Sequence, residues 1–103
     1  MEKEELPKAI VCIGCGTDQI PVINAAYAQG YKVIGVDQTH GYGVVDTLIK
    51  VSTYDTRLVI EEIQKQLKIF RIKGVICRAS AQAVITANEL SKFLNLPSFG
   101  DDL

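Results

Sequence analysis

A loop with two glycines is the feature of this sequence whose residue types and spacing point most directly to chemistry. The residues from Gly14 to Gln19 read Gly-Cys-Gly-Thr-Asp-Gln, after a short apolar run and before a segment with helical spacing. The first glycine permits a tight turn, and the second lets the backbone approach a phosphate or carboxylate closely. The start of the following helix offers free N–H groups to an anion. The pattern therefore predicts an anion-binding loop.

Asp37 favours a more specific interpretation, in which the loop holds a dinucleotide. It ends the next apolar run, 21 residues after Gly16, near where dinucleotide-binding folds place the acid that binds a ribose. Two residues count against this interpretation. Gln19 stands where the fingerprint has a third Gly or Ala, and Asp18 would repel a pyrophosphate unless its carboxylate points away. The alternative is that Gly14 and Gly16 only make a tight turn between a strand and a helix.

The cysteines give a second possible chemistry, because Cys12 and Cys15 have C-x-x-C spacing. With Cys77 and His40 they could form a zinc site, or the two could be a redox pair. However, Cys12 lies inside an apolar run and Cys77 ends another, where cysteine behaves as a small apolar side chain. A redox C-x-x-C starts at a helix N-terminus, and Cys12 comes too early for that. We therefore favour a packing role, and we expect no bound metal.

The elements that must position these residues alternate between two kinds of segment. Short apolar runs bounded by turn residues read as strands that are buried on both faces, and Pro97 is tolerated in an edge strand. We expect strands over residues 8–13, 32–37, 48–51 and 74–77, with a fifth, edge strand over 96–99. Segments with apolar residues at helical spacing lie between them. We expect helices over residues 20–29, 56–67 and 80–94.

The helix ends and inward faces can also be predicted. Asp55 and Ser80 can cap the second and third helices, and Asn95 can end the third in the left-handed conformation. Pro21 suits the first turn of the first helix, and Gly30 suits its C-terminal cap. The apolar spacing predicts these inward-facing side chains: Ile20, Ile23, Tyr27, Ile60, Ile63, Leu67, Val84, Ala87, Leu90 and Leu94.

This alternation predicts a Rossmann-like, three-layer α/β/α fold with a parallel sheet of four or five strands. Right-handed crossovers make 3-2-1-4-5 the simplest strand order. The first and fourth strands are then neighbours, and ligands bind beyond the carboxyl ends of the strands. The segments at those ends are residues 14–19, 37–38, 52–54 and 78–80.

Length and composition limit the classes of protein that fit. The 103 residues suffice for one domain over residues 8–103, preceded by a charged lead-in over residues 1–7. Lys and Arg number 11 against 12 Asp and Glu, so there is no basic field for nucleic acid. No apolar run approaches membrane-spanning length, and the charged N-terminus lacks an apolar signal core, so we expect a cytoplasmic protein. Three cysteines without a secretory context argue against a disulfide framework.

Three features in order along the chain resemble the N-terminal, pre-ATP-grasp domain of ATP-grasp carboxylate–amine ligases, with carbamoyl-phosphate synthase-like and phosphoribosylglycinamide-type enzymes nearest. The first is the run from Ala9 to Gly16, followed by a helix and the run from Gly30 to Asp37. The second is the run from Val51 to Asp55 before a helix. The third runs from Gly74 to Ser80 and, after a helix, ends at Leu94–Pro97. The resemblance covers about residues 8–99.

The resemblance implies a domain that positions a small anionic acceptor substrate and does not catalyse by itself. The substrate-binding residues that it implies are Gly14, Cys15, Gly16, Thr17, Asp18, Gln19, Asp37, Gln38, Arg78 and Ser80. Arg78 would pair with the anion through its planar fork, and a surface ion pair is its alternative role. The complete enzyme would use ATP and Mg²⁺, held by ATP-grasp lobes on the same or a separate chain. The isolated chain should then be inactive in ligation.

Two other functions stay open on the residues alone. The chain could be a stand-alone nucleotide- or dinucleotide-binding regulatory module that uses the glycine loop and places Asp37 on a ribose. It could also be an interaction protein without a ligand, because the fold alone implies no function. An apolar patch left by missing partners could then support a homodimer.

Overall fold

The computed structural model describes residues 5–16, 19–39, 44–77 and 81–96. Strands and helices alternate along these residues, as the sequence predicts. In chain order they are β1 (Lys8–Ile13), α1 (Ile20–Ala28), β2 (Lys32–Val36), β3 (Thr47–Ile49), α2 (Thr56–Gln66), β4 (Arg71–Cys77) and α3 (Ala81–Phe93). Within the described ranges, no helix combines the length and apolar character needed to cross a membrane.

The four strands form one parallel sheet in the order β3-β2-β1-β4. This confirms the predicted fold class and the 3-2-1-4 part of the predicted order, whereas the predicted fifth strand falls almost entirely outside the described residues. Ile13 of β1 is level with Val36 of β2 and with Cys77 of β4. The carboxyl ends of these three strands therefore meet at one edge. The chain adds β2 and β3 on one side of β1 and β4 on the other, so the switch point of the topology lies between β1 and β4.

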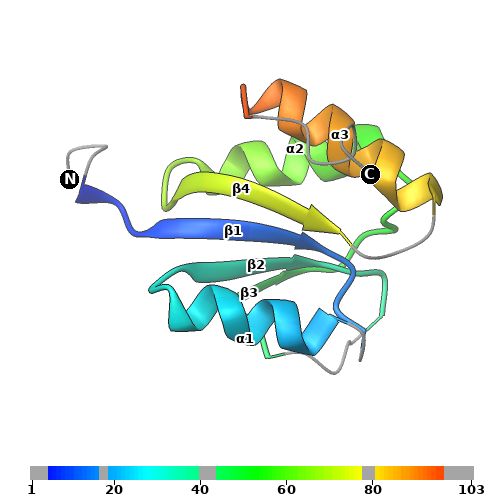
Figure 1. The fold of residues 1–103 in the computed structure, drawn as a ribbon. Coiled ribbons are helices and arrows are strands. Elements are labelled where there is room, and N and C mark those ends of the chain that lie inside the picture. The colour runs from blue at the N-terminus through cyan, green and yellow to red at the C-terminus, as the bar shows by residue number, and fades with distance from the viewer. Residues whose placement is uncertain (1–4, 17–18, 40–43, 78–80, 97–103) are drawn as a thin grey trace.

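Helices cover both faces of the sheet, with α1 on one face and α2 and α3 on the other (Figure 1). The alternation of side chains along β1 explains this arrangement. Ala9, Val11 and Ile13 belong to the larger core, which α2 and α3 complete. Cys12 points to the opposite face and joins a smaller core. The other buried members of that core are Ile23, Ala26 and Val33.

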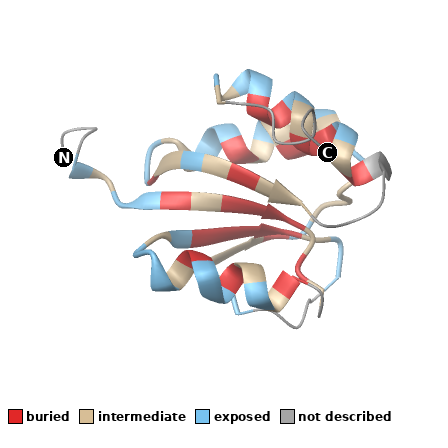
Figure 2. Ribbon diagram, in the orientation of Figure 1, coloured by how far each residue is buried: buried red, intermediate tan, exposed pale blue. Residues whose placement is uncertain are grey.

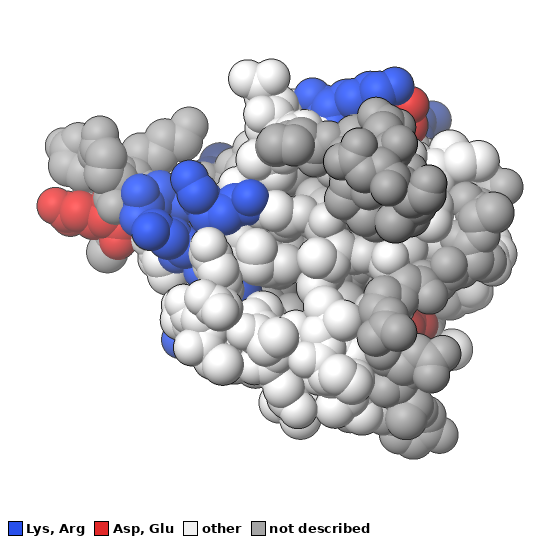
Figure 3. All heavy atoms as spheres, viewed as in Figure 1, with Lys and Arg blue, Asp and Glu red and all other residues white. Residues whose placement is uncertain are grey.

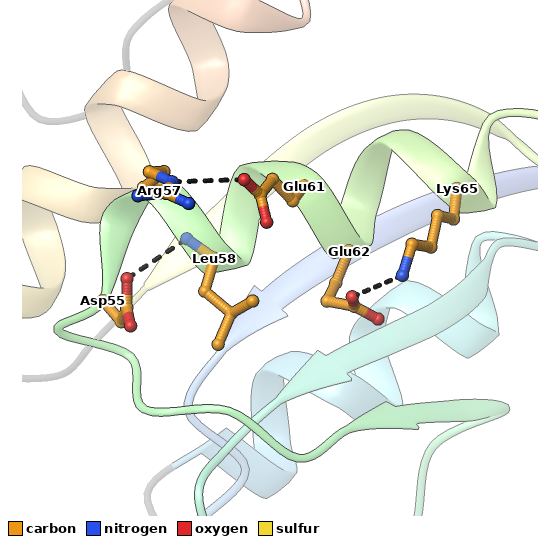
Figure 4. A network of polar contacts seen from close by, with 6 residues as sticks. All are labelled: Asp55, Arg57, Leu58, Glu61, Glu62 and Lys65. Carbon is orange, nitrogen blue, oxygen red and sulfur yellow. Dashed lines mark hydrogen bonds and ion pairs between the residues drawn. The ribbon is translucent and has the colours of Figure 1, made fainter.

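The predicted helix ends are present where the structure describes them. Pro21 lies in the first turn of α1, and Gly30 follows its last turn with a φ of +88°. The Asp55 carboxylate accepts a hydrogen bond from the main-chain N–H of Leu58 at 3.1 Å, which caps α2 (Figure 4). Asn95 adopts a φ of +60° just beyond α3. Ser80, the predicted cap of α3, lies outside the described residues.

The third and fourth strands differ most from the prediction, and β2 ends at Val36, one residue earlier than predicted. The third strand is Thr47–Ile49 rather than 48–51, because the chain turns after Ile49 and the Val51 N–H donates back to the Ile49 carbonyl. The fourth strand begins at Arg71 rather than at residue 74. Its first residues do not read as a buried run, but Arg71 pairs with Lys8 of β1 and donates its main-chain N–H to the Pro7 carbonyl at 2.9 Å.

The inward faces of the helices are rotated slightly from the predicted ones. In α1 the buried residues are Ile23 and Ala26, and in α2 they are Val59 and Ile63. In α3 Ala83, Ala87 and Leu90 are fully buried. The remaining predicted residues are only partly buried, namely Ile20, Tyr27, Ile60, Leu67, Val84 and Leu94.

Candidate functional site

The candidate site begins at the turn that follows β1. The Gly14 N–H donates to the Val36 carbonyl at 2.7 Å, so the turn is held against the end of β2. Gly14 has a φ of +94°, a conformation that L side chains rarely adopt. The chain then enters α1 through a second turn, in which the Gln19 N–H donates to the Gly16 carbonyl at 2.9 Å. These contacts place the glycine loop over the carboxyl ends of β1 and β2.

The carboxylate of Asp37 is bound to this loop. One of its oxygens accepts the main-chain N–H of Cys15 at 2.8 Å. The other accepts the main-chain N–H of Thr39 at 3.1 Å and its hydroxyl at 3.2 Å. A carboxylate has about four acceptor positions, so at least one remains for a further donor. The half-buried position of Asp37 leaves its carboxylate within reach of solvent.

The surroundings and the backbone conformation of Gly16 do not explain why this position is a glycine. A Cβ built there would meet no atom within 4 Å, and Gly16 is absent from the residues with positive φ. Neither packing nor backbone conformation therefore requires a glycine at this position. The space around the Cβ position of Gly16 is open.

Gln19 does not occupy the open space at Gly16. It is only 3% exposed, and its amide oxygen lies 3.6 Å from the Cys12 sulfur as a hydrogen-bond acceptor. The Cys12 thiol is also 3.1 Å from the Gly14 carbonyl oxygen. Gln19 thus fills space beneath the loop, beside β1. The departure from the dinucleotide fingerprint at Gln19 therefore remains, and Asp18 lies outside the described residues.

The two cysteines of the C-x-x-C sequence are packing residues in this structure. Both are buried and free. The Cys15 sulfur lies directly over Gly35 of β2, where any Cβ would collide with it. Burial raises the pKa of the Cys12 thiol to about 12 and that of Cys15 to about 11. Thiols with such pKa values stay protonated at neutral pH and are poor nucleophiles and metal ligands.

A zinc site receives no support from the described part of the chain. No group of three or more His, Cys, Asp or Glu residues suitable for a metal ion occurs there. His40, the fourth residue of the site considered from the sequence, lies outside the described residues. Among the described residues, the groups that this edge offers to a ligand are main-chain donors and the carboxylate of Asp37.

The structure brings together five of the predicted site residues at the carboxyl edge of the sheet. They are Gly14, Cys15, Gly16, Gln19 and Asp37. Gln38 follows directly and is exposed. The other four predicted residues, Thr17, Asp18, Arg78 and Ser80, lie outside the described residues.

Sequence reasoning missed two residues that shape this site. Thr39 orients the Asp37 carboxylate, and its position two residues after an aspartate is the signal of an Asx turn. Gly35 makes room for Cys15. No sequence signal predicts that contact, since the two residues lie on different elements.

Comparisons with known proteins agree with the fold and change the family that the sequence suggested. The sequence matches no protein-family model and no curated protein. Among solved structures, it is similar to the Bordetella bronchiseptica enzyme WbmG in complex with NAD and UDP, with a TM-score of 0.62 and 18% identity over 84% of this chain and 34% of that one. It is also similar to WbmH of the same organism in complex with NAD⁺, with a TM-score of 0.57 and 17% identity over 89% and 37%.

A third similar structure is UDP-glucose 4-epimerase from Thermotoga maritima with UDP-glucose, with a TM-score of 0.57 and 18% identity over 85% of this chain and 35% of that one. At such identities the likeness is one of fold. The chain spans about a third of the length of these three proteins. The fold and the loop geometry thus define a Rossmann-like α/β unit of the kind found in these enzymes.

The resemblance to ATP-grasp ligases is therefore wrong. The similar structures are an epimerase and NAD-complexed enzymes rather than ATP-grasp or carbamoyl-phosphate synthase-like ligases. The motifs behind that resemblance are a glycine turn after the first strand and an acid after the second. Doubly wound sheets use such features for many purposes. The resemblance was the reason to expect ATP, Mg²⁺ and ATP-grasp lobes, so these expectations are no longer supported.

Proposed function

We propose that this chain is a dinucleotide-binding module whose ligand is an NAD-type dinucleotide, held at the carboxyl edge of the sheet. The observation that carries the proposal is Gly16. Its Cβ position is empty and its φ is not positive, so a glycine there serves an approaching ligand better than it serves the fold. The NAD complexes of the similar structures WbmG and WbmH support the same assignment.

Each residue of the site has a role in this proposal. The turn at Gly14 leads the chain over the end of β1, and Gly16 leaves room for a pyrophosphate near the start of α1. The acceptor position left on the Asp37 carboxylate would receive a ribose hydroxyl. The Cys15 N–H, which donates to that carboxylate, keeps it beside the loop.

The same carboxylate predicts which dinucleotide is preferred. NADP carries a phosphate on the ribose hydroxyl that Asp37 would bind, and two negative charges at that distance repel each other. No Lys or Arg contacts the Asp37 carboxylate among the described residues to offset this repulsion. NAD is therefore the expected ligand, and NADP should bind more weakly.

The chain's own contribution is to bind and orient the cofactor. A bound nicotinamide ring supplies hydride transfer, and no described side chain at this edge is a ready acid or base for a substrate. We infer that this unit binds the cofactor, and that a reaction or a sensing function would need groups other than the described side chains at this edge.

Isothermal titration of the purified chain with NAD, NADP and ATP–Mg²⁺ tests the proposal. We expect saturable NAD binding, weaker NADP binding and no preference for ATP–Mg²⁺. Gly16→Ala should abolish NAD binding while the protein stays folded. Gly74→Ala is the matched control, because Gly74 lies within β4 and a Cβ there meets only the flexible end of Ile10, at 3.2 Å. A folded chain that gives no heat with NAD, or a Gly16→Ala variant that binds as well as the parent, would overturn the proposal.

A further inference from the structure

The connection between β3 and α2 carries an aromatic side chain that has no role in the dinucleotide site as proposed so far. Tyr54 lies on this connection, and its exposed fraction is 56%. It is the most exposed aromatic side chain among the described residues, and neither hydrophobic core includes it. Packing of the two cores therefore does not explain an aromatic residue at this position.

The pairing of the strands puts Tyr54 at the same edge of the sheet as Asp37. β3 is the neighbour of β2, and Ile49 of β3 is level with Val36 of β2. The Asp37 N–H donates to the Ile49 carbonyl at 3.1 Å, so Asp37 lies against the end of β3. From there the chain runs along the arrowhead end of the sheet to α2 (Figure 1). Tyr54 therefore follows β3 as Asp37 follows β2 and Gly16 follows β1.

The main chain on either side of Tyr54 is held by a turn. The Tyr54 N–H donates to the Ser52 hydroxyl at 3.1 Å, and the Asp55 N–H donates to the Ser52 carbonyl, also at 3.1 Å. Asp55 then caps α2 through its carboxylate. The turn fixes the main chain, while the Tyr54 side chain is exposed. A side chain on a fixed turn loses less freedom when it binds a ligand.

The order of the site residues across the edge indicates which part of the dinucleotide reaches Tyr54. This step rests on the proposed function, in which Gly16 leaves room for the pyrophosphate and Asp37 binds the adenosine ribose. The ribose joins the pyrophosphate through its 5′ carbon and the base through its 1′ carbon, so the base lies beyond the ribose. Beyond Asp37, on the side away from Gly16, the next strand is β3. The adenine therefore extends toward the connection that carries Tyr54.

The connections between the elements, rather than the strands, have to meet this base. β1 and β2 are buried over most of their length (Figure 2). Lys8 and Arg71 begin β1 and β4, at the opposite ends of the strands from the site. Lys and Arg side chains gather there, near the N-terminus (Figure 3). The length of the strands separates this group of cations from the adenine, whereas Tyr54 offers an aromatic ring at the correct edge.

We propose that Tyr54 is a base-binding residue of this site, and that its ring stacks on the adenine of the dinucleotide. Every base has an aromatic face, so stacking holds a base without recognising the hydrogen-bonding groups at its edge. Tyrosine suits a position that is partly in water, because its ring is apolar and its hydroxyl is polar. The site then extends over the ends of three strands, with Gly16 after β1, Asp37 after β2 and Tyr54 after β3.

Isothermal titration of the full chain with NAD tests this role. We expect Tyr54→Ala to weaken NAD binding by about tenfold, because the ring is lost. Tyr54→Phe keeps the ring and should bind NAD as the parent does. Ile69→Ala is the matched control, because Ile69 is a large apolar side chain that is 52% exposed and lies between α2 and β4, away from the site. Thermal unfolding shows that each variant is folded.

Two further measurements separate stacking from other contacts. Nicotinamide hypoxanthine dinucleotide has a similar aromatic face to NAD but a different edge, and it should bind within about threefold of NAD. In NMR spectra of the complex, the adenine proton signals should move upfield because they lie over an aromatic ring. This shift should be present with Tyr54→Phe and lost with Tyr54→Ala.

The outcomes distinguish the stacking role from the proposed function. If the parent binds NAD and Gly16→Ala abolishes binding, but Tyr54→Ala binds as well as the parent, the dinucleotide site stands and the stacking role is wrong. A loss of more than about tenfold with the hypoxanthine dinucleotide would also overturn it, because the edge of the base would then be recognised. If the parent gives no heat with NAD, the proposed function and the stacking role fail together.

Discussion

The main-chain N–H of Cys15 donates to the carboxylate of Asp37 at 2.8 Å, across 22 positions of sequence. This hydrogen bond joins the glycine loop after β1 to the residue that directly follows β2. It is charge-assisted, and such bonds are stronger than those between neutral groups. The bond therefore holds Cys15, in the first half of the loop, close to the end of β2.

Asp37→Asn should release the loop. An amide has only one acceptor oxygen, so it cannot satisfy both Cys15 and Thr39 as the carboxylate does. We expect a loss of about 1–3 kcal/mol in the free energy of unfolding and faster hydrogen exchange at the Cys15 amide. Thr39→Val is the control, because it removes only the exposed hydroxyl contact at 3.2 Å. Unchanged protection of the Cys15 amide in Asp37→Asn would contradict this account.

Gly35→Ala should destabilise the protein, and the cause can be isolated. The new Cβ would collide with the Cys15 sulfur and approach the Val45 methyl groups at 3.1 and 3.2 Å. Overpacking of this kind costs about 1–3 kcal/mol. Adding Cys15→Ala removes the sulfur, so the double variant should lose less stability than the sum of the two single variants. Urea unfolding of all four proteins measures this coupling, and additive losses would show that the two side chains do not compete for space.

The buried thiols should make the protein sensitive to alkaline pH. Burial raises the pKa of Cys12 from 9.0 to about 12 and that of Cys15 from 9.0 to about 11. Below pH 9.0 both thiols are protonated in the folded and the unfolded chain. Above that pH the unfolded chain releases these protons first, so stability should fall as pH rises toward the folded pKa values.

Replacing Cys12 by alanine tests this pH dependence. The variant is less stable at neutral pH because it leaves a cavity, but its stability should fall less steeply between pH 9.0 and about 12. Chemical denaturation at several pH values gives both slopes. Thiol reagents should also modify native Cys12 and Cys15 slowly at neutral pH. Parallel slopes for parent and variant would count against a raised pKa at Cys12.

Asp55→Ala should weaken α2 at its first turn. The carboxylate accepts the Leu58 N–H, and loss of such a cap costs about 1 kcal/mol. Arg57→Ala is a useful comparison, because the Arg57–Glu61 pair is 89% and 50% exposed (Figure 4) and exposed pairs contribute less than about 1 kcal/mol. Thermal unfolding should therefore separate the two variants. If Arg57→Ala were the more damaging, the cap would not be the main support of this turn.

The alternation of segments was predictable because β1 and β2 are buried on both faces and therefore read as nearly continuous apolar runs. Asn95 was predictable as a helix end because few other side chains tolerate positive φ. The start of β4 was not predictable from the sequence, because Arg71 and Lys73 interrupt the apolar pattern. The position of that start depends on pairing with Lys8, which a local pattern does not contain.

The candidate site was predictable in its location and only partly in its construction. Parallel strands bring their carboxyl ends together, so the loop after β1 and Asp37 had to be neighbours. The contact between Cys15 and Gly35 depends on how two separate elements pack, and no spacing encodes it. The ATP-grasp resemblance failed for a related reason. Its motifs describe how strands turn into helices, and this requirement is shared by unrelated enzymes.

The unequal size of the two cores has a consequence for the order in which the molecule comes apart. The sheet, α2 and α3 share one large set of buried side chains, whereas α1 is attached through Ile23, Ala26 and a few partners. The layer formed by α1 should therefore detach at a lower free energy than the rest, as a separate cooperative unit. The glycine loop joins that layer to β1. A ligand that bridges the loop and the sheet would tie the weaker unit to the stronger one.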